Sequence, residues 1–177
     1  MIGQGQFQLS LAVDCSRATH HIVTADYERQ LHLYSSDGNT LIRSFCGHGS
    51  NIDQTNRVNG MCFDDERMRI LVCDFNNKRL TVWSSDGSQF ITTINMPNNQ
   101  NPLSVCVDYH QGSHRVIVGT YQSQILVFDA SNNQVIQILG SQGQQPGQFA
   151  NYIYGVCVAS DGILLATDNH NHCVQIF

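Results

Sequence analysis

The sequence predicts an all-β fold in which four consecutive repeats each form one antiparallel sheet. Three observations lead to this class. Short apolar runs recur four times in the same order, the third run of every repeat ends on an aromatic residue, and turn residues such as Asp-Gly follow that aromatic in the first two repeats. No 15-residue segment shows a helical apolar period bounded by caps, so we expect no long helix.

Each repeat contains apolar runs of strand length. The first runs are 11–14, 61–64, 105–108 and 156–159, and the second runs are 22–26, 70–74, 116–120 and 164–168. The third runs are 30–34, 79–83, 124–128 and 173–177, and fourth runs follow at 41–45, 90–94 and 135–139. Within the third runs, Leu31-His32-Leu33-Tyr34 and Leu80-Thr81-Val82-Trp83 alternate as expected for a strand with one covered face.

The spacing of the repeats predicts a β-propeller. The closing aromatics Tyr34, Trp83, Phe128 and Phe177 follow one another at intervals of 49, 45 and 49 residues. That interval suits one four-stranded antiparallel blade, and propellers contain about four to eight such blades. We expect repeats at about 7–47, 56–95, 101–140 and 149–177, within one propeller segment that covers residues 1–177.

Several short motifs mark the openings and turns of the repeats. They are Gly147-Gln148-Phe149, residues 155–158 and residues 166–177, with a second Gly-Gln-Phe at 5–7, and together they resemble the NHL repeat. Asn171-His172-Cys173 resembles the Asn-His-Leu signature before the third strand, and Asn77-Lys78-Arg79 takes the same place in the second repeat. The first repeat has Arg29-Gln30-Leu31 there, and the third has Gln122-Ser123-Gln124, with Thr120 in place of the preceding aspartate.

The resemblance, which is to the NHL domains of tripartite-motif-type proteins, has structural consequences. Such propellers usually close with about six blades, so it implies that this chain forms part of a six-bladed propeller. An open arc of blades exposes strand edges and an apolar blade face, and both favour self-association.

Composition limits the function classes. Apolar residues make up 41% of the chain and charged residues 13%, which is typical of a globular protein. The formal net charge is −5, so a polyanion-binding domain is not indicated. No apolar stretch is long enough for a membrane helix, and we expect no membrane partner.

The cysteines are interpreted as structural. There are seven, an odd number, and no Cys-x-x-Cys pair is present. Cys62, Cys106 and Cys157 share one repeat position, and Cys73 shares another with Ala25, Gly119 and Thr167. Small side chains at these positions suit crowded strands, and free thiols favour a reducing compartment, so we expect the cytoplasm.

Histidines raise the question of a metal. Some NHL-like propellers are amidating lyases, and that branch of the resemblance would imply zinc held by histidines near the starts of the inner strands. Those positions are Ser10, Asn59, Leu103 and Tyr154. We therefore expect no cofactor, no metal and no catalytic residues. The alternative metal site would use His48, His170 and His172, and a metal-dependent lyase is kept as the second alternative function.

Aspartates that close the second runs, Asp26, Asp74 and Asp168, could be catalytic acids in a ring. We interpret them instead as acceptors for backbone N–H groups of the turn that follows, which is a common role of Asx side chains.

The remaining candidate site is a face of loops. Loops that join fourth to first strands and second to third strands emerge on one side of a propeller. The residues predicted to bind a partner there are Tyr27, Arg29, Arg57, Phe75, Asn77, Lys78, Arg79, Tyr121, Asn169 and His170. Aromatic and amide groups with a few cations are suited to grip a peptide, or to stack on single-stranded RNA.

These residues predict a non-catalytic module that binds a protein or peptide. The resemblance implies the target-recognition part of a ubiquitin-ligase-like or signalling protein. Single-stranded RNA is the first alternative, because some NHL proteins bind RNA with this face. However, eight of the nine basic residues precede residue 90, which leaves no basic track over several blades.

Overall fold

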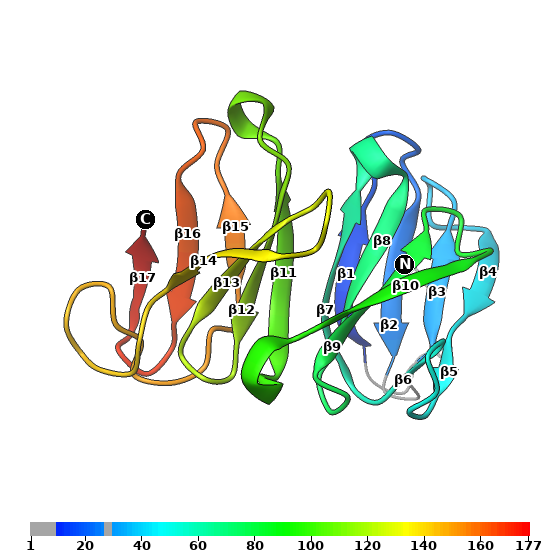
Figure 1. Ribbon diagram of the computed structural model, residues 1–177. Coiled ribbons are helices and arrows are strands. Elements are labelled where there is room, and N and C mark those ends of the chain that lie inside the picture. The colour runs from blue at the N-terminus through cyan, green and yellow to red at the C-terminus, as the bar shows by residue number, and fades with distance from the viewer. Residues whose placement is uncertain (1–9, 27–29) are drawn as a thin grey trace. The chain divides into compact units, whose positions relative to one another are not determined.

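The computed structural model describes residues 10–26 and 30–177, and almost every regular element in them is a β-strand (Figure 1). The predicted all-β class is confirmed, as are the four-stranded antiparallel sheets of blade type. The chain divides into two compact units, Met1–Asn95 and Met96–Phe177.

The first unit contains two four-stranded sheets. Its elements are β1 (Ser10–Cys15), β2 (Ile22–Asp26), β3 (Leu31–Tyr34), β4 (Leu41–Phe45), β5 (Gly47–His48), β6 (Gln54–Thr55), β7 (Val58–Asp64), the short 3₁₀ helix η1 (Asp65–Arg67), β8 (Arg69–Asp74), β9 (Arg79–Ser84) and β10 (Phe90–Asn95). Strands β1 to β4 pair in chain order, and so do β7 to β10. Strands β5 and β6 form a two-stranded parallel pair in the linker between these sheets.

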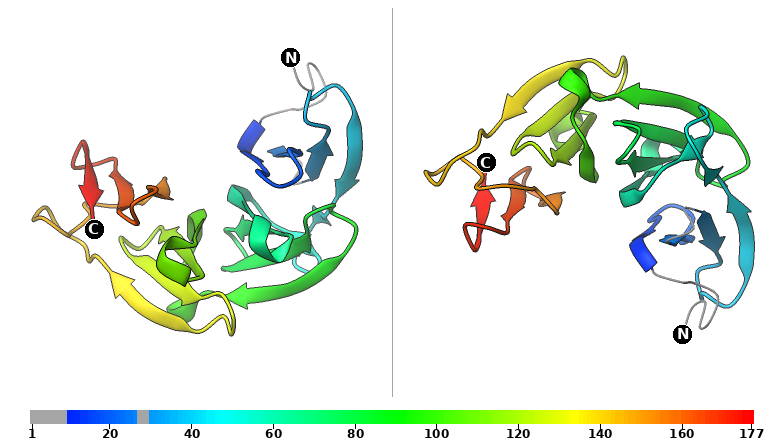
Figure 2. Two further views of the ribbon diagram at one scale, coloured as in Figure 1. Left: turned by 90° about the horizontal axis from the view of Figure 1, so that it is seen from above. Right: turned by 90° about the horizontal axis from the view of Figure 1, so that it is seen from below.

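The second unit contains a four-stranded and a three-stranded sheet. Its elements are η2 (Pro97–Asn99), β11 (Pro102–Asp108), η3 (His110–Gly112), β12 (Arg115–Thr120), β13 (Ile125–Asp129), β14 (Val135–Leu139), β15 (Val156–Val158), β16 (Leu164–Asp168) and β17 (Cys173–Ile176). Neighbouring strands are again consecutive in the chain. Viewed along the strands in Figure 2, each sheet runs in chain order from its first strand to its last.

The hairpins that join third to fourth strands follow from their turn residues. In the first repeat, Gly38 has a φ of 71° and the Asp37 carboxylate accepts the Asn39 N–H at 3.0 Å. In the second repeat, Gly87 has a φ of 66° and Asp86 accepts the Ser88 N–H at the same distance. An L side chain rarely adopts this positive φ, which is why glycine follows the aspartate in both turns.

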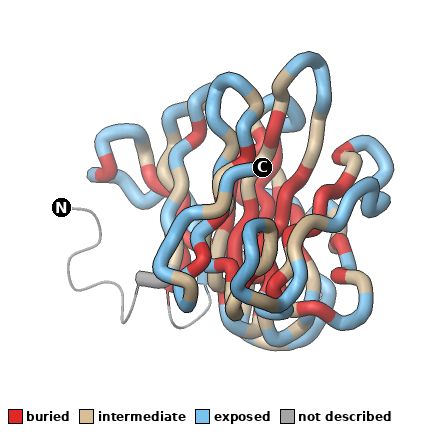
Figure 3. Tube along the Cα trace, turned by 90° about the vertical axis from the view of Figure 1, so that its left-hand side faces the viewer, coloured by how far each residue is buried: buried red, intermediate tan, exposed pale blue. Residues whose placement is uncertain are grey.

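Both units place their cores between sheets. In the first unit, side chains of β2 and β3 pack against those of β7 and β8, and Trp83 closes this cluster. In the second unit, side chains of β12 and β13 pack against those of β16, together with Phe149 and Ile153 from the linker before β15. Figure 3 shows the same pattern, with buried positions along the strands and exposed positions in the connections.

Small residues recur near the ends of the second strands, where neighbouring segments come close. Ala25 and Cys73 are fully buried. A Cβ built on Gly119 would lie 2.5 Å from the Ser104 hydroxyl oxygen and 2.9 Å from the Ile153 carbonyl oxygen. No L side chain fits there without moving the backbone of the linker before β15.

We predict that Gly119→Val lowers the free energy of unfolding by about 1–3 kcal/mol, because overpacking forces the linker away from β12. Urea unfolding followed by fluorescence measures this. Gly47→Ala is the control, since its Cβ would meet only the flexible Gln54 side chain at 3.9 Å. Equal stability of Gly119→Val and wild type would contradict the close approach of these segments.

Candidate functional site

The loops between second and third strands lie against the linkers that lead into first strands. In the first unit, the Phe75 N–H donates to the Arg57 carbonyl at 3.0 Å, and the Asn76 N–H donates to the Asn56 carbonyl at 3.1 Å. In the second unit, the Tyr121 N–H donates to the Asn101 carbonyl at 2.9 Å. Each unit therefore has one end of its sheets at which both kinds of segment come together.

A buried aspartate holds the turn of the second repeat. Asp74 has no exposed surface, and its carboxylate accepts the Asn56 N–H at 2.7 Å, the Asn77 side-chain amide at 2.7 Å and the Arg79 Nε at 2.9 Å. The Asn77 amide also donates to the Gly49 carbonyl at 2.9 Å. The loop, the linker and the third strand are thus all hydrogen-bonded to one carboxylate. These donors compensate the negative charge of Asp74 without water.

The fourth repeat contains the same arrangement. Asp168 is fully buried and accepts the Asn171 amide at 2.8 Å and the Gln175 amide at 3.2 Å, while the Asn171 amide also donates to the Gly143 carbonyl. Burial alone would raise the pKa of Asp168, but these side-chain bonds and the backbone N–H groups of Ala150 and Asn171 lower it below its ordinary value. Asp168 accepts the Asn171 N–H of the following turn, as predicted, whereas Asp74 accepts the side-chain amide of Asn77 in its turn and the Asn56 N–H of the linker.

The residue between the motif asparagine and the third strand has a left-handed backbone. The φ angles are 57° at Lys78, 54° at His172 and 59° at Ser123. The Lys78 and His172 N–H groups donate back to the carbonyls of Phe75 and Asn169, which closes each turn. Their side chains are exposed, so the histidine of Asn171-His172-Cys173 is a turn residue on the surface.

The first and third repeats close the turn differently. Asp26 accepts the Gln30 N–H at 3.1 Å, and its second oxygen lies 3.1 Å from Nε2 of His32. In the third repeat, the Thr120 hydroxyl donates to the Gln124 carbonyl at 2.8 Å. The Gln122 side chain bonds to Asn101 instead of reaching a carboxylate. The strand registers, Ala25 opposite Leu31 and Gly119 opposite Ile125, give these two turns the same length, so a turn of this length can be closed by either a carboxylate or a hydroxyl.

The candidate binding residues of the first unit divide into exposed and enclosed groups. Arg57 is exposed, with its guanidinium carbon 4.6 Å from the centre of the Phe75 ring. Lys78 is also exposed and lies in the same loop as Phe75, to whose carbonyl its N–H donates. Asn77 and Arg79 point inward: the Arg79 guanidinium also donates to the Asn51 and Gln54 carbonyls. Tyr27 and Arg29 lie outside the described residues.

In the second unit, an aromatic cluster lies at the loop end. The Tyr121 and Tyr152 rings stack with centroids 4.0 Å apart, and their hydroxyls are joined by a 2.8 Å hydrogen bond. Tyr154 and His170 each meet the Tyr152 ring edge to face, at 5.8 and 5.7 Å. We call these four residues the tyrosine cluster. Tyr121 (40%) and Tyr154 (52%) leave much of their surface exposed.

Two members of this cluster were not among the predicted binding residues. These are Tyr152 and Tyr154, and the sequence analysis predicts for Tyr154 only a place at the start of an inner strand. The signal in the sequence is the alternation Tyr152-Ile153-Tyr154 in a linker, where Ile153 is fully buried. Alternation around a buried residue places both tyrosines on the surface.

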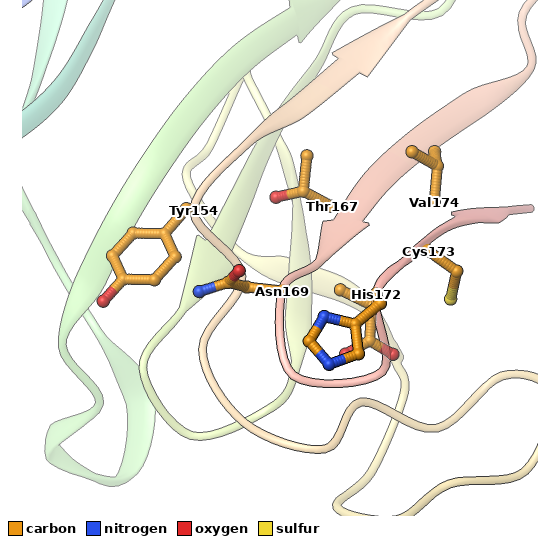
Figure 4. A pocket seen from close by; sticks show the side chains of 7 residues that line it. Tyr154, Thr167, Asn169, His172, Cys173 and Val174 are labelled. Carbon is orange, nitrogen blue, oxygen red and sulfur yellow. The ribbon is translucent and has the colours of Figure 1, made fainter.

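A hollow of about 590 Å³ adjoins the cluster. Figure 4 shows Tyr154 and Asn169 side by side at its rim, with His172 nearby on the β16–β17 turn and Thr167, Cys173 and Val174 along the strands. Asp168 also lines the hollow but uses its carboxylate in the network described above.

The described residues do not build a metal centre. No group of three or more His, Cys, Asp or Glu side chains within 10–26 and 30–177 is placed to hold an ion. Two of the thiols are poor nucleophiles, because burial raises the pKa of Cys46 to about 11 and that of Cys106 to about 12.

Comparison with known families supports the motif interpretation. Residues 151–177, which contain Asp168, Asn171 and most of the tyrosine cluster, match the family model of the NHL repeat. The chain carries an NHL repeat. Such repeats build β-propeller interaction modules. No curated protein matches the sequence. Among the described residues, none forms a helix long and apolar enough to cross a membrane.

We predict that Arg79→Ala lowers the free energy of unfolding by about 3 kcal/mol, since it leaves the buried Asp74 without its cation and two carbonyls without a donor. Thermal and urea unfolding measure the loss. Lys78→Ala, which removes the neighbouring exposed cation, should stay within about 0.5 kcal/mol of wild type. Similar losses in both variants would refute the inward role of Arg79.

We also predict a pH signature for the aspartate of the NHL repeat. Because the pKa of Asp168 is lowered in the folded state, its stabilisation is complete above the unfolded pKa of about 3.9 and disappears as the pH falls through the folded value. Asp168→Asn should therefore be less stable than wild type at pH 7, and the difference should narrow below about pH 4. Urea unfolding over this range tests it, with the exposed Asp161→Asn as control; a difference that does not change with pH would contradict it.

Proposed function

We propose that the protein is a non-catalytic recognition module that binds an extended segment of a partner protein, and that the tyrosine cluster is its main contact in the second unit. The observation that carries this proposal is the exposed stack of Tyr121 on Tyr152, flanked by Tyr154 and His170. Tyrosines bury much apolar area at little entropic cost and keep a hydroxyl for hydrogen bonds, so they are enriched at binding hot spots.

The cluster is held in place before any partner arrives. Its backbone is tied through the Ile153 N–H, which donates to the Thr120 carbonyl, and through the Ser123 hydroxyl, which donates to the Asn151 carbonyl. The hydroxyl bond between Tyr121 and Tyr152 fixes the rings against each other. A preorganised aromatic surface loses less entropy on binding, which favours recognition of a flexible peptide.

Charge favours a protein partner over RNA. Between residues 96 and 177 the sequence has four aspartates and one basic residue, Arg115, whose guanidinium is bonded to Asp108. Stacked tyrosines suit bases as well as peptides, but phosphate groups require cations, and this unit does not offer them.

The first unit adds a second, smaller contact patch to the proposal, made of Arg57, Phe75 and Lys78. Its cation stacked on an aromatic ring is suited to carbonyl and aromatic groups of a peptide. In a longer parent protein of the ubiquitin-ligase or signalling type, these loops would select the target. A cytoplasmic location remains part of this proposal.

We predict that Tyr152→Ala weakens peptide binding by about tenfold or more, because Tyr152 contacts every other ring of the cluster. A phage-displayed random peptide library is selected on the protein, and the affinities of the recovered peptides are measured by fluorescence anisotropy. Tyr109→Ala, in the connection between β11 and β12, is the matched control and should bind as wild type does.

The competing function is tested in parallel with a random single-stranded RNA pool over a salt series. The proposal expects no RNA binding at low salt. Micromolar binding that falls steeply with salt and is lost in Tyr152→Ala would replace the protein partner with RNA. The proposal would be overturned if no peptide is recovered, or if every recovered peptide binds Tyr152→Ala as tightly as it binds the wild type.

A further inference from the structure

In the second repeat, the chain places one of its own cations on an aromatic ring. The guanidinium carbon of Arg57, the residue before β7, lies 4.6 Å from the centre of the ring of Phe75, the residue after β8. The Phe75 N–H donates to the Arg57 carbonyl, so a backbone bond keeps the two residues side by side. A cation within about 6 Å of a ring centre is attracted by the negative face of the ring.

The third repeat has the aromatic residue of this pair without the cation. The strand registers make Tyr121 equivalent to Phe75. They place Asn101, an uncharged residue, at the position of Arg57. The backbone bond is the same, because the Tyr121 N–H donates to the Asn101 carbonyl. The Asn101 side chain, however, accepts a bond from the Gln122 amide at 2.9 Å. The second unit therefore repeats the ring but not the guanidinium.

The Tyr121 ring is held in a fixed orientation. It stacks on Tyr152 with centroids 4.0 Å apart and an angle of 23° between the rings, and a hydrogen bond joins the two hydroxyls. Tyr121 is still 40% exposed. Because one face of the ring rests on Tyr152, the exposed surface of Tyr121 belongs to its other face and its edge. A ring that is already immobilised loses little entropy when a ligand stacks on it.

The charges of the second unit favour a cationic ligand. Between residues 96 and 177 the sequence has four aspartates and one arginine, with no lysine or glutamate, which gives a formal charge of −3. The arginine, Arg115, begins β12, whereas Tyr121 follows the other end of that strand. Its Nε donates to Asp108 at 2.8 Å. The basic residue of this unit is thus committed to an ion pair at the end of β12 away from Tyr121.

A carboxylate near the cluster keeps its negative charge. Asp168 lies two residues before His170 and accepts the Ala150 N–H, in the linker that carries Tyr152, at 3.3 Å. Its other donors are the side-chain amides and the backbone N–H described above, all of them neutral. Asp74, the equivalent residue in the second repeat, receives a guanidinium instead. Since the pKa of Asp168 is lowered, it is ionised at neutral pH and attracts a cation at this end of the sheets.

We propose that the tyrosine cluster selects an arginine side chain of the partner segment, with the guanidinium stacked on the exposed face of Tyr121. The partner would supply the group that Arg57 supplies within the second repeat. Arginine suits this place better than lysine, because its planar and weakly hydrated guanidinium stacks on aromatic faces. The hydroxyl oxygens of Tyr121 and Tyr152 can accept its N–H groups. This inference rests on the function proposed above and names the residue that the cluster recognises.

Two labelled pools of seven-residue peptides test this with the whole chain. The central residue is arginine in one pool and citrulline in the other, and the six remaining positions are random without lysine or arginine. Citrulline has nearly the shape of arginine but no charge. We expect fluorescence anisotropy to give about tenfold or greater affinity for the arginine pool, because only a cation is attracted to the ring face and to the acidic surroundings. A pool with central lysine should bind more weakly than the arginine pool.

Two variants at one position separate the ring from the general charge of the unit. Tyr121→Leu removes the aromatic face but keeps an apolar side chain, and should reduce the preference for arginine over citrulline to about twofold or less. Tyr121→Phe is the matched control, because it keeps the ring and loses only the hydroxyl, and should retain the preference. Unchanged melting temperatures show that both variants are folded. A preference that persists in Tyr121→Leu would mean that the negative charge alone attracts the peptide.

Equal affinities of the arginine and citrulline pools, equal affinities of the arginine and lysine pools, or no binding of the arginine pool would each overturn this inference. The proposed function would still stand if peptides selected from the random library bind the wild type more tightly than Tyr152→Ala. If that selection also fails, both the inference and the proposed function are wrong.

Discussion

The hydrogen-bonded aspartate at the end of the second strand organises this protein. In the second and fourth repeats, a fully buried carboxylate binds the side chain of the asparagine three residues later, and that asparagine reaches on to a glycine carbonyl of the preceding linker. An ionised group can remain in such a place only if every lone pair is satisfied, so the turn and the linker must keep their positions. The surface around the turn is consequently fixed by a buried charge below it.

This hydrogen bonding determines which side chains of the loops remain available to a partner. Because the asparagine and the cation or amide of the third strand are used internally, the groups left for a partner are the residues between and beside them. In the first unit these are Arg57, Phe75 and Lys78, and in the second unit they are the tyrosine cluster with Asn169. The aspartate and asparagine of the motif therefore mainly hold the turn in place. The neighbouring side chains, which differ between the repeats of this chain, are the ones left to contact a partner.

Equivalent core positions in the two units can be compared directly, because the units are built from the same repeat. Equivalent positions on the sheets of the two units have the same role, but the first unit fills its inter-sheet space with Phe45, Trp83 and Phe90, whereas the second has Leu139, Phe177 and an apolar cavity. A repeat protein allows this comparison within a single chain.

Much of this was determined by the sequence alone: the all-β class, the order of strands in each sheet and the structural role of Asp74 and Asp168 follow from apolar periodicity, repeat spacing and local turn chemistry, all of which act over a few residues. The sequence did not distinguish the inward Arg79 from the outward Lys78, because one left-handed residue decides which of the two faces the carboxylate. It also gave no indication that Tyr152 stacks on Tyr121, 31 residues away. Only the tertiary structure could decide these points, since the first depends on the backbone conformation at Lys78 and the second on which segments meet when one sheet packs against the next.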